Sequence, residues 1–432
     1  MQCKLPLCLI PIMMLSCATT YSDVPTRSSD DLTGDWDGLR THLLDEGIDF
    51  RIGYTSETAS NLQGGYEKLW RYADQWTFAT TLDLQKLIGL DQAQFKIVVT
   101  DRNGRNLSAD ANLHTLEPVQ EIYGRGQTWR WTQAWYDQSY FNGMLDWKFG
   151  RLTEDGDFAA FGCEFQNLTF CDSPPGNLAG SHWYNAPVSE WGTRLKLSAT
   201  ELGYVQIGVF EVNPSYLLTK YALDLGDPPG ATGALLPLEV GWLPTFGKGL
   251  KGSYKFGAWY NTSKAPDVVE DTNGQPLALA GGQPAMHRGQ DGAYVNFLQQ
   301  LTNPSSSVSQ QGLNVFLNAT FADRRTSILD NQIAAGLLYK GPFASRPADE
   351  LGFSLGRTHV NSRVADVEIL QNTAGLGPVA VQGSEYAGEL FYNVNAARWL
   401  DLRPNIQYVC QPRGVAQNTD DVILGLRLSI NF

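Results

Sequence analysis

The chain has 432 residues, 43% of them hydrophobic, and a net charge of −13. Its mean hydropathy of −0.24 excludes a bundle of membrane helices, and past the N-terminus no apolar run approaches the roughly twenty residues that a spanning helix needs. The acidic balance argues against nucleic acid as a partner, because a phosphate-binding surface needs an excess of Lys and Arg.

Residues 1–22 have the features of an export signal. Their only charge is Lys4, and the apolar run that follows is interrupted by Ser16 alone. The run is too short to span a membrane comfortably, and cleavage is expected between Cys17 and Asp23. The residues before Cys17 also resemble a lipoprotein cleavage box, so lipidation of that cysteine stays an open alternative.

Residues 23–47 are expected to form a periplasmic N-terminal segment. Leucines on one helical face, followed by Gly47, predict a short helix from about Trp36 to Glu46.

From Ile48 onward, segments of alternating apolar and polar residues recur. In the first of them Ile48, Phe50 and Ile52 alternate with Asp49 and Arg51. A period of two predicts a strand with one apolar and one polar face. Sixteen such strands are expected, at 48–58, 73–85, 93–103, 128–140, 145–152, 189–198, 203–212, 235–243, 251–261, 291–301, 312–321, 330–340, 350–359, 384–395, 399–409 and 420–432.

The last strand shows the pattern most clearly. Leu424, Leu426 and Leu428 alternate with small or polar residues, and the chain ends on the aromatic Phe432. A terminal aromatic strand resembles the signal by which outer-membrane barrel proteins are recognised for assembly. Taken alone, the strand also suits the edge of a soluble sandwich.

The lengths of the connections decide between a sandwich and a membrane barrel. Connections after even-numbered strands are short, at 86–92, 141–144, 199–202, 244–250, 302–311, 341–349 and 396–398. Those after odd-numbered strands are mostly long, at 59–72, 104–127, 153–188, 213–234, 262–290, 360–383 and 410–419, with 322–329 the exception. Short periplasmic turns opposite long outer loops are typical of outer-membrane barrels. We therefore predict an all-β fold, a sixteen-stranded antiparallel transmembrane β-barrel over residues 48–432.

Three of the six cysteines lie in or at the edge of the export signal. Of the others, Cys163 and Cys171 belong to one connection, so a local disulfide is the expected pairing in an oxidising compartment. Cys410 is then left over.

Seven long motifs lie along the mature chain, within a similarity that covers nearly all of it. They are LTGDWDGLRTHLLDEGIDF (32–50), TDRNGRNLS (100–108), QEIYGRGQTWRWTQAWYDQSYFNGMLDWKFGRL (120–152), CEFQNLTFCDSPPGN (163–177), WYNAPVSEWGTRLK (183–196), GYVQIGVFEVNP (203–214) and LRPNIQYV (402–409). These motifs resemble the carbohydrate-selective outer-membrane porins, the porin B or glucose-porin family. The resemblance implies a sixteen-stranded barrel that passes glucose-like sugars by diffusion. Cys410 departs from the polar or basic residue expected there.

The alternation predicts which wall side chains face the lumen. Charges of both signs there create a transverse field and offer a sugar many hydrogen-bond partners. The wall candidates are Glu57, Asp83, Lys96, Glu239, Glu385, Glu389, Arg403 and Arg427.

Arg102 and Arg105 match arginines of the family's TDRxGRNLS motif, so the resemblance makes them candidates for the pore constriction. A guanidinium group offers five fixed donors, which suits vicinal hydroxyls, and an aromatic face such as that of Trp183 suits the C–H face of a pyranose. The constriction and sugar-contact candidates are Arg102, Arg105, Arg130, Trp183, Glu190 and Arg194. The alternative for each arginine is a structural pairing with a lumen carboxylate.

The connection 153–188 is the longest. In porins a long loop often folds into the barrel and narrows it, and a disulfide within it would stiffen it. The alternative is a loop packed on top of the barrel.

Other chemistry has weak support. The five histidines are scattered without metal-ligand spacing, and there is no nucleophile elbow or phosphate loop. We expect no metal, no cofactor and no enzyme activity. The alternative hypotheses are an outer-membrane hydrolase and a plugged structural or adhesive barrel. The expected partners are sugars, outer-membrane lipid and lipopolysaccharide, the barrel-assembly machinery and other copies in a homotrimer.

Overall fold

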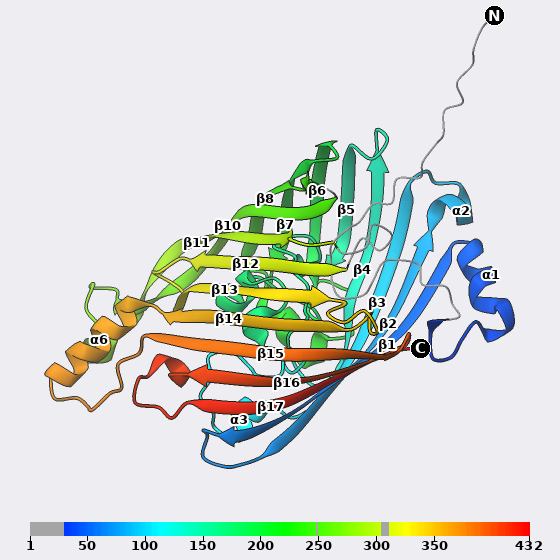
Figure 1. Cartoon of the computed structure of the whole chain (residues 1–432). Helices are drawn as coiled ribbons and strands as arrows, with labels where there is room; N and C mark the ends of the chain where they lie inside the picture. The colour runs from blue at the N-terminus through cyan, green and yellow to red at the C-terminus, as the bar shows by residue number, and fades with distance from the viewer. Residues whose placement is uncertain (1–29, 248, 304–310) are drawn as a thin grey trace, which may run out of the picture.

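The computed structural model describes residues 30–247, 249–303 and 311–432. The predicted export signal lies outside these residues. The strands curve into a barrel, with α1 and the C-terminus at one end and α6 at the other (Figure 1). The C-terminus lies at the predicted periplasmic end.

The strands follow the predicted order. They are β1 (Ile48–Gln63), β2 (Trp70–Asp83), β3 (Ala93–Gly104), β4 (Trp129–Tyr140), β5 (Leu145–Leu152), β6 (Glu190–Thr200), β7 (Gly203–Val212), β8 (Gly233–Trp242), β9 (Thr245–Phe246), β10 (Leu250–Asp271), β11 (Pro284–Gln300), β12 (Gly312–Ala322), β13 (Leu329–Lys340), β14 (Glu350–Val360), β15 (Ser384–Ala397), β16 (Leu400–Cys410) and β17 (Asp421–Asn431).

The sheet closes on itself. Each long strand pairs antiparallel with its neighbours, and β1 pairs with both β2 and β17. The two-residue β9 only extends the pairing at the turn before β10. The described chain therefore forms a closed barrel of sixteen strands, which confirms the predicted fold. Among the described strands, closure leaves no edge with unpaired backbone groups, as a lipid environment requires.

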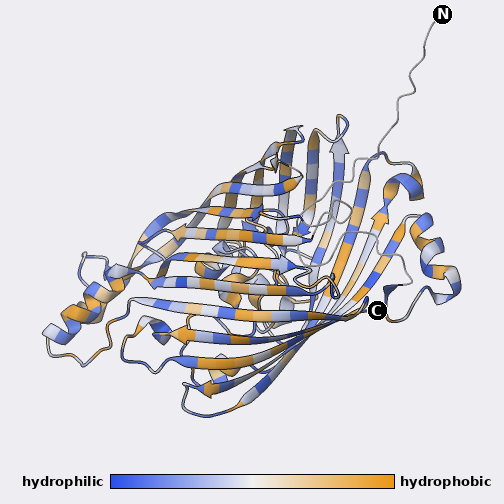
Figure 2. Cartoon of the chain, viewed as in Figure 1, coloured by the Kyte–Doolittle hydropathy of each residue, from blue (hydrophilic) through white to orange (hydrophobic). Residues whose placement is uncertain are grey.

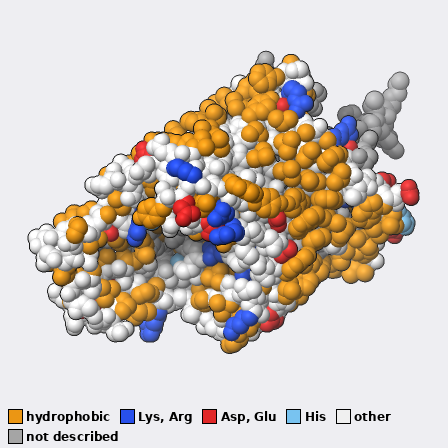
Figure 3. All heavy atoms as spheres, turned by 90° about the horizontal axis from the view of Figure 1, so that it is seen from below, with side chains coloured by type: hydrophobic (Ala, Val, Ile, Leu, Met, Phe, Trp, Pro, Cys, Tyr) orange, Lys and Arg blue, Asp and Glu red, His pale blue; other side chains and the backbone are white. Residues whose placement is uncertain are grey.

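Burial along the strands is inverted relative to a soluble protein. On β17, Leu424 and Leu426 are 45% and 43% exposed, whereas Arg427 is 8% exposed. Figure 2 shows polar and apolar residues alternating along the strands, and Figure 3 shows hydrophobic side chains gathered on the outer face over the half that carries α1. Apolar side chains point to lipid and polar ones point inward, as expected for a membrane barrel.

Several strands are longer than predicted, on the side of the long loops. β1 continues to Gln63, and β10 and β11 extend through most of the predicted connection 262–290. In these extensions the inward positions, such as Ser263 and Asp267, are buried, while the outward Lys264 is exposed. Because the outward face is no longer apolar there, hydrophobic periodicity underestimates the length of these strands.

Helices are confined to the ends of the barrel and its loops. They are η2 (Trp36–Gly38), α1 (Leu39–Asp45), α2 (Leu84–Ile88), α3 (Leu107–Asp110), η3 (Glu154–Gly156), η4 (Leu168–Phe170), α4 (Pro175–Ala179), η5 (Pro214–Leu217), η6 (Thr219–Tyr221), α5 (Leu277–Ala280), α6 (Ser362–Thr373) and η7 (Pro412–Gly414). No helix in the described part of the chain is long and apolar enough to cross a membrane.

The predicted N-terminal helix is present as η2 and α1. Arg40 of α1 is buried, where it forms an ion pair with Asp31 at 2.8 Å and donates to the backbone oxygen of Phe50 at 3.3 Å. These contacts fix the segment before the barrel against the start of β1.

Asp83, a predicted lumen residue, instead lies at the end of β2. Its carboxylate accepts hydrogen bonds from the amides of Gln85 and Lys86, at 3.0 and 3.2 Å, and so caps the N-terminus of α2. A carboxylate in this position satisfies amides that the helix itself leaves unpaired.

Candidate pore constriction

Two long connections fold into the barrel. They are residues 105–128, here called the arginine loop, and residues 153–189, here called the pore loop. Their apolar side chains, including Leu107, Phe165 and Phe170, are buried in one cluster with Phe316 and Phe391 of the inner wall. This core lies between loop and wall, so the pore loop does not rest on top of the barrel.

Basic residues of the wall hold the pore loop on opposite sides of the barrel. Asp157 pairs with Lys148 of β5 at 2.8 Å and with Arg194 of β6 at 3.3 Å. Further along the loop, Glu164 pairs with Arg403 of β16 at 2.9 Å. Because β5 and β6 lie far from β16 in the strand order, the loop crosses the lumen between these anchors.

Buried glutamates of the wall accept hydrogen bonds from backbone amides of the loops. Glu239 accepts from Ala159 at 2.8 Å. Glu389 accepts from Gln166 and Asn167 at 2.9 and 2.8 Å. In the same way, Glu385 accepts from the amide of Leu116 in the arginine loop at 2.8 Å. Three predicted lumen glutamates thus face inward and bind the loop backbone, which satisfies amides that would otherwise be buried without a partner.

Arg403 and Arg427 lie directly opposite each other on β16 and β17. Like charges at opposed positions destabilise a sheet, so each arginine needs a carboxylate. Glu164 from the pore loop supplies the carboxylate for Arg403. Arg427 pairs with the predicted lumen residue Glu57 of β1 at 3.2 Å and also with Glu121 from the arginine loop at 2.9 Å. The paired arginines therefore favour docking of both loops.

Electrostatics agree with these ion pairs. Burial opposes ionisation of Glu164, but the Arg403 guanidinium holds the pKa of this carboxyl below its ordinary value. Burial also opposes ionisation of Asp157, and Lys148 and Arg194 hold its pKa below the ordinary value. Both loop acids are thus charged when they bind the wall.

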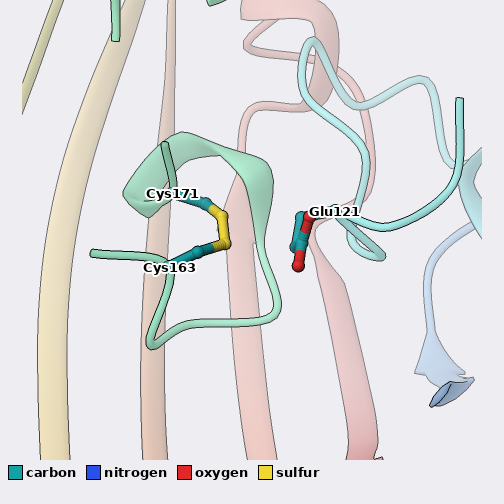
Figure 4. Close-up of side chains that lie close together, drawn as sticks. All are labelled: Glu121, Cys163 and Cys171. Atoms are coloured by element: carbon teal, nitrogen blue, oxygen red, sulfur yellow. A yellow bond between two sulfur atoms is a disulfide. The ribbon is translucent and has the colours of Figure 1, made fainter. Parts of the chain in front are cut away.

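A disulfide joins Cys163 to Cys171 in the pore loop. Figure 4 shows Glu121 beside it. The three residues are the one group with metal-ligand geometry in the described chain. Both sulfurs are committed to the disulfide, however, and the Glu121 carboxylate pairs with Arg427. The group does not fit a metal ion, because thiolate ligands are required.

The three arginines predicted at the constriction have different environments. Arg102 is buried and donates from Nε to Gln75 at 2.6 Å; within the described chain its terminal guanidinium nitrogens have no hydrogen-bond partner. Arg105 is exposed and pairs with Asp110 at 2.7 Å. Arg130 instead donates to three backbone oxygens, those of residues 125, 216 and 217, at 2.8 to 3.0 Å.

Arg194 and Glu190 are inward-facing but buried. Besides Asp157, Arg194 contacts Asp137 at 3.6 Å and also Asp146. Glu190 is fully buried at the base of the pore loop. Arg194 is therefore occupied by carboxylates, and Glu190 has no exposed surface to offer a solute.

Trp183 does not face the lumen with an open ring, as a sugar contact would require. Its side chain is 0% exposed, its ring packs edge-on against Trp259 and Tyr294, and its indole donates to Ser173 at 3.0 Å. The ring fills the space between the pore loop and the wall, so it offers no free face to a pyranose in this structure.

Another wall candidate is Lys96. Its ammonium lies 6.0 Å from the ring centre of Trp135 on β4, its cross-strand neighbour. Both residues therefore face the lumen on the periplasmic side of the loops.

The sequence patterns did not reveal the loop and wall residues that dock the pore loop. They are Glu121, Lys148, Asp157, Glu164 and Lys255. Lys148 and Lys255 could have been found from strand alternation, because each has the inward parity. The loop acids carry no such signal, since their positions depend on the path of the loop.

Comparisons with known proteins agree with this architecture. Residues 67–432 match the family described as "Carbohydrate-selective porin, OprB family". The chain is 43% identical to Porin B of Pseudomonas aeruginosa over 415 residues, 93% of this chain and 91% of that protein. It is 35% identical to the putative porin QuiX of Acinetobacter baylyi, covering 96% of each.

A solved structure has the same fold. The high-pH structure of Pseudomonas putida OprB has a TM-score of 0.90 and 43% identity, covering 94% of this chain and 99% of that one. The chain belongs to the OprB family of carbohydrate-selective porins, which are outer-membrane channels for sugars.

Proposed function

We propose that this porin passes sugars of glucose-like size by passive diffusion, through a lumen that the pore loop and the arginine loop narrow, and that Arg102 and Arg105 contact the solute. The supporting observation is the state of Arg102. Arg102 points inward and is 6% exposed, about as much as Arg194 and Arg427. What distinguishes it is that no residue of the described chain accepts from its terminal N–H groups, whereas Arg194 and Arg427 are saturated by carboxylates.

A guanidinium with unused donors suits two neighbouring hydroxyls of a sugar. Arg105 and Asp110 add an accessible donor and acceptor close by in the sequence. A sugar would exchange part of its water shell for these groups at little net cost, which allows both entry and release. Such a site needs no chemical step, so we infer that the chain is not an enzyme.

Arg130 has a supporting role in this proposal. Its guanidinium donates hydrogen bonds to carbonyl oxygens of the arginine loop and of residues 216 and 217. It thus holds two outer loops together and leaves Arg102 beside the passage. Trp183 is assigned to packing of the pore loop.

Further partners follow from the fold. We propose that residues 1–22 direct export, that the outer rim contacts lipopolysaccharide, and that the strand ending at Phe432 is recognised by the barrel-assembly machinery. We also propose that the barrel assembles as a homotrimer. Cross-linking of the purified protein in detergent tests the oligomeric state.

Liposome swelling tests the proposed sugar contacts. Vesicles containing the wild type should swell in isotonic glucose faster than in a disaccharide, and protein-free vesicles should not swell. In the double variant Arg102→Ala/Arg105→Ala, we expect the ratio of glucose to disaccharide rates to fall about twofold or more, because the discriminating donors are lost. Arg398→Ala, at an exposed pair with Asp30, is the control. An unchanged ratio in the double variant would contradict the assignment of the two arginines.

A further inference from the structure

The long hairpin of β10 and β11 carries two cations on its outward face. Lys264 and Arg288 lie directly opposite each other in the register of the two strands, and both side chains are exposed. The next cross-strand pair, Ala265 and His287, faces inward, where His287 binds the buried Asp267 at 2.8 Å. Because successive side chains of a strand alternate between its faces, Lys264 and Arg288 point away from the lumen.

Neither of these cations has a partner within the protein. Among the described residues, none forms a hydrogen bond or an ion pair with either side chain. The acids at outward positions of the same two strands are occupied, since Asp291 pairs with Arg325 at 3.6 Å and Glu270 pairs with an arginine of α6 at 2.9 Å. Like charges directly opposite each other repel, so an anion from outside the chain would stabilise this arrangement.

The cation pair lies beyond the apolar belt, on the outer side of the membrane. Tyr260 of β10 and Phe321 of β12 are 45% and 51% exposed at outward positions, and such aromatic residues mark the interface between lipid and water. Lys264 follows four residues after Tyr260, a rise of about 13 Å along the tilted strand. The two strands extend towards the end of the barrel that carries α6, opposite the C-terminus (Figure 1). The cations are therefore at the level of the headgroups of the outer leaflet.

Tyr260 brings a third donor to the same place. Its ring lies over Gly289, since a Cβ atom at that position would come within 2.2 Å of the phenol oxygen. Gly289 has a φ of +79° and lies where the register of the two strands shifts, so both the backbone conformation and the contact require glycine. The phenol group thus lies beside the residue next to Arg288, and its hydroxyl has no acceptor in residues 30–247, 249–303 and 311–432.

We propose that Lys264, Arg288 and Tyr260 form a binding site for a phosphate group of lipopolysaccharide in the outer leaflet. A guanidinium binds phosphate oxygens through two parallel N–H bonds, and an ammonium adds a compact charge. Below the site, Phe256 and the ring of Tyr260 expose apolar surface that acyl chains would cover. A lipid combines phosphate with acyl chains and matches both surfaces, whereas a free anion matches only one. This inference rests on the proposed contact of the outer rim with lipopolysaccharide and does not depend on the solute.

Binding of lipid A, the phosphorylated anchor of lipopolysaccharide, tests the site. The full-length wild type, refolded in detergent without lipopolysaccharide, should bind labelled diphosphoryl lipid A at least about tenfold more tightly than Lys264→Gln/Arg288→Gln, because both cations attract the headgroup. Tyr260→Phe keeps the ring and should weaken binding about twofold or more, because one donor is lost. The control Lys251→Gln/Arg398→Gln removes two positive charges from exposed side chains at the periplasmic end and should bind like the wild type.

Three results would overturn the site. One is equal affinity of the wild type and Lys264→Gln/Arg288→Gln for diphosphoryl lipid A. Another is equal affinity of the wild type for diphosphoryl and dephosphorylated lipid A, because phosphate would then not be recognised. The third is displacement of lipid A by millimolar inorganic phosphate, which would show that the cations bind a free anion and not a lipid.

A measurement on the wild type guards against misfolding of the variants. Its affinity for diphosphoryl lipid A should fall between about 0.1 M and 1 M salt, because salt screens exposed charges. An affinity that salt leaves unchanged would mean that apolar contacts alone bind the lipid, which contradicts the proposal.

The swelling assay separates this site from the passage of sugars. Lys264→Gln/Arg288→Gln should keep the wild-type ratio of glucose to disaccharide rates, because both side chains point away from the lumen. A changed ratio would place the two cations in the passage and contradict their assignment to lipid. Loss of lipid A binding with an unchanged ratio would support the lipid site whatever the roles of Arg102 and Arg105.

Discussion

Glu57 of β1 and Arg427 of β17 lie directly opposite each other where the first and last strands of the barrel pair, with 3.2 Å between carboxylate oxygen and guanidinium nitrogen. The same guanidinium binds Glu121 of the arginine loop at 2.9 Å and approaches the backbone oxygen of Phe165 in the pore loop at 3.4 Å. One buried ion group thus joins the closure of the barrel to the docking of both loops.

Arg427→Met should destabilise the barrel by about 3–5 kcal/mol, because it leaves two buried carboxylates without their cation. We expect a lower urea midpoint for the protein folded in vesicles, and part of the loss should be restored in Glu57→Gln/Arg427→Met. Arg398→Ala, at an exposed ion pair, should change the midpoint little. Equal midpoints for Arg427→Met and Arg398→Ala would show that the ion group does not stabilise the closure.

Removing the disulfide should loosen the pore loop without unfolding the barrel. Cys163 and Cys171 are eight residues apart. Closing this short loop lowers the conformational entropy of the unfolded segment, which stabilises the folded loop by about 2–3 kcal/mol. Cys163→Ala/Cys171→Ala should therefore show larger open-channel noise and faster proteolysis within the loop, at an unchanged temperature of heat-induced mobility shift in gels. Cys410→Ala is the control. Noise equal to that of the wild type would mean that the wall anchors alone fix the loop.

A charge on the lipid-facing side should be costly only within the apolar belt. Leu426→Arg should lower folding stability in vesicles by about 2–4 kcal/mol, since a cation near the midplane is poorly solvated. Leu62→Arg places the same side chain at an exposed position in the extension of β1, where the cost should be small. Similar losses for both variants would show that the extension of β1 also lies in lipid.

Loss of the terminal aromatic residue should reduce assembly in cells more than folding in vitro. The amide of Phe432 donates to the backbone oxygen of Ile52 at 2.9 Å, and its ring centre lies 5.3 Å from that of Trp76. Deletion of Phe432 removes these few contacts, so we expect refolding in detergent to remain. The amount in outer-membrane fractions should fall several-fold, whereas Phe432→Tyr should retain it. Normal amounts after the deletion would argue against recognition of this residue.

Arg130→Ala should behave differently from Arg102→Ala. Arg130 holds the backbone of two loops, so its removal should increase open-channel noise. Arg102 makes one side-chain hydrogen bond, to Gln75, so its removal should change the response to sugar while the current stays quiet. Single-channel traces with and without glucose separate the two effects. The same phenotype in both variants would contradict the assignment of Arg130 to holding the loops and of Arg102 to contacting the sugar.

The wall of the barrel was predictable from sequence because its signal is local. Alternation in a strand such as β17 assigns Arg427 inward and Leu426 outward without knowledge of any partner. The limits of the strands were less predictable where the outward residues become polar, as at Lys264. Asp83 shows a related limit, since strand parity alone did not reveal that it caps a helix.

The interior of the lumen was only partly predictable, because the loops are placed by contacts between residues distant in sequence. The inward direction of Glu389 followed from parity, but its partners at Gln166 and Asn167 did not. Trp183 looked like a sugar platform from residue type alone, whereas burial assigns it to packing. Resemblance to a family identified the pore, and the positions of individual side chains required the structure.

The most direct test of the central claim is the current through single channels in a planar bilayer, titrated with glucose. A sugar-conducting lumen predicts a steady current that falls in a saturable manner as glucose is added, and falls less with a sugar too large to enter. A steady current that glucose leaves unchanged, or a folded barrel that carries no current, would contradict it.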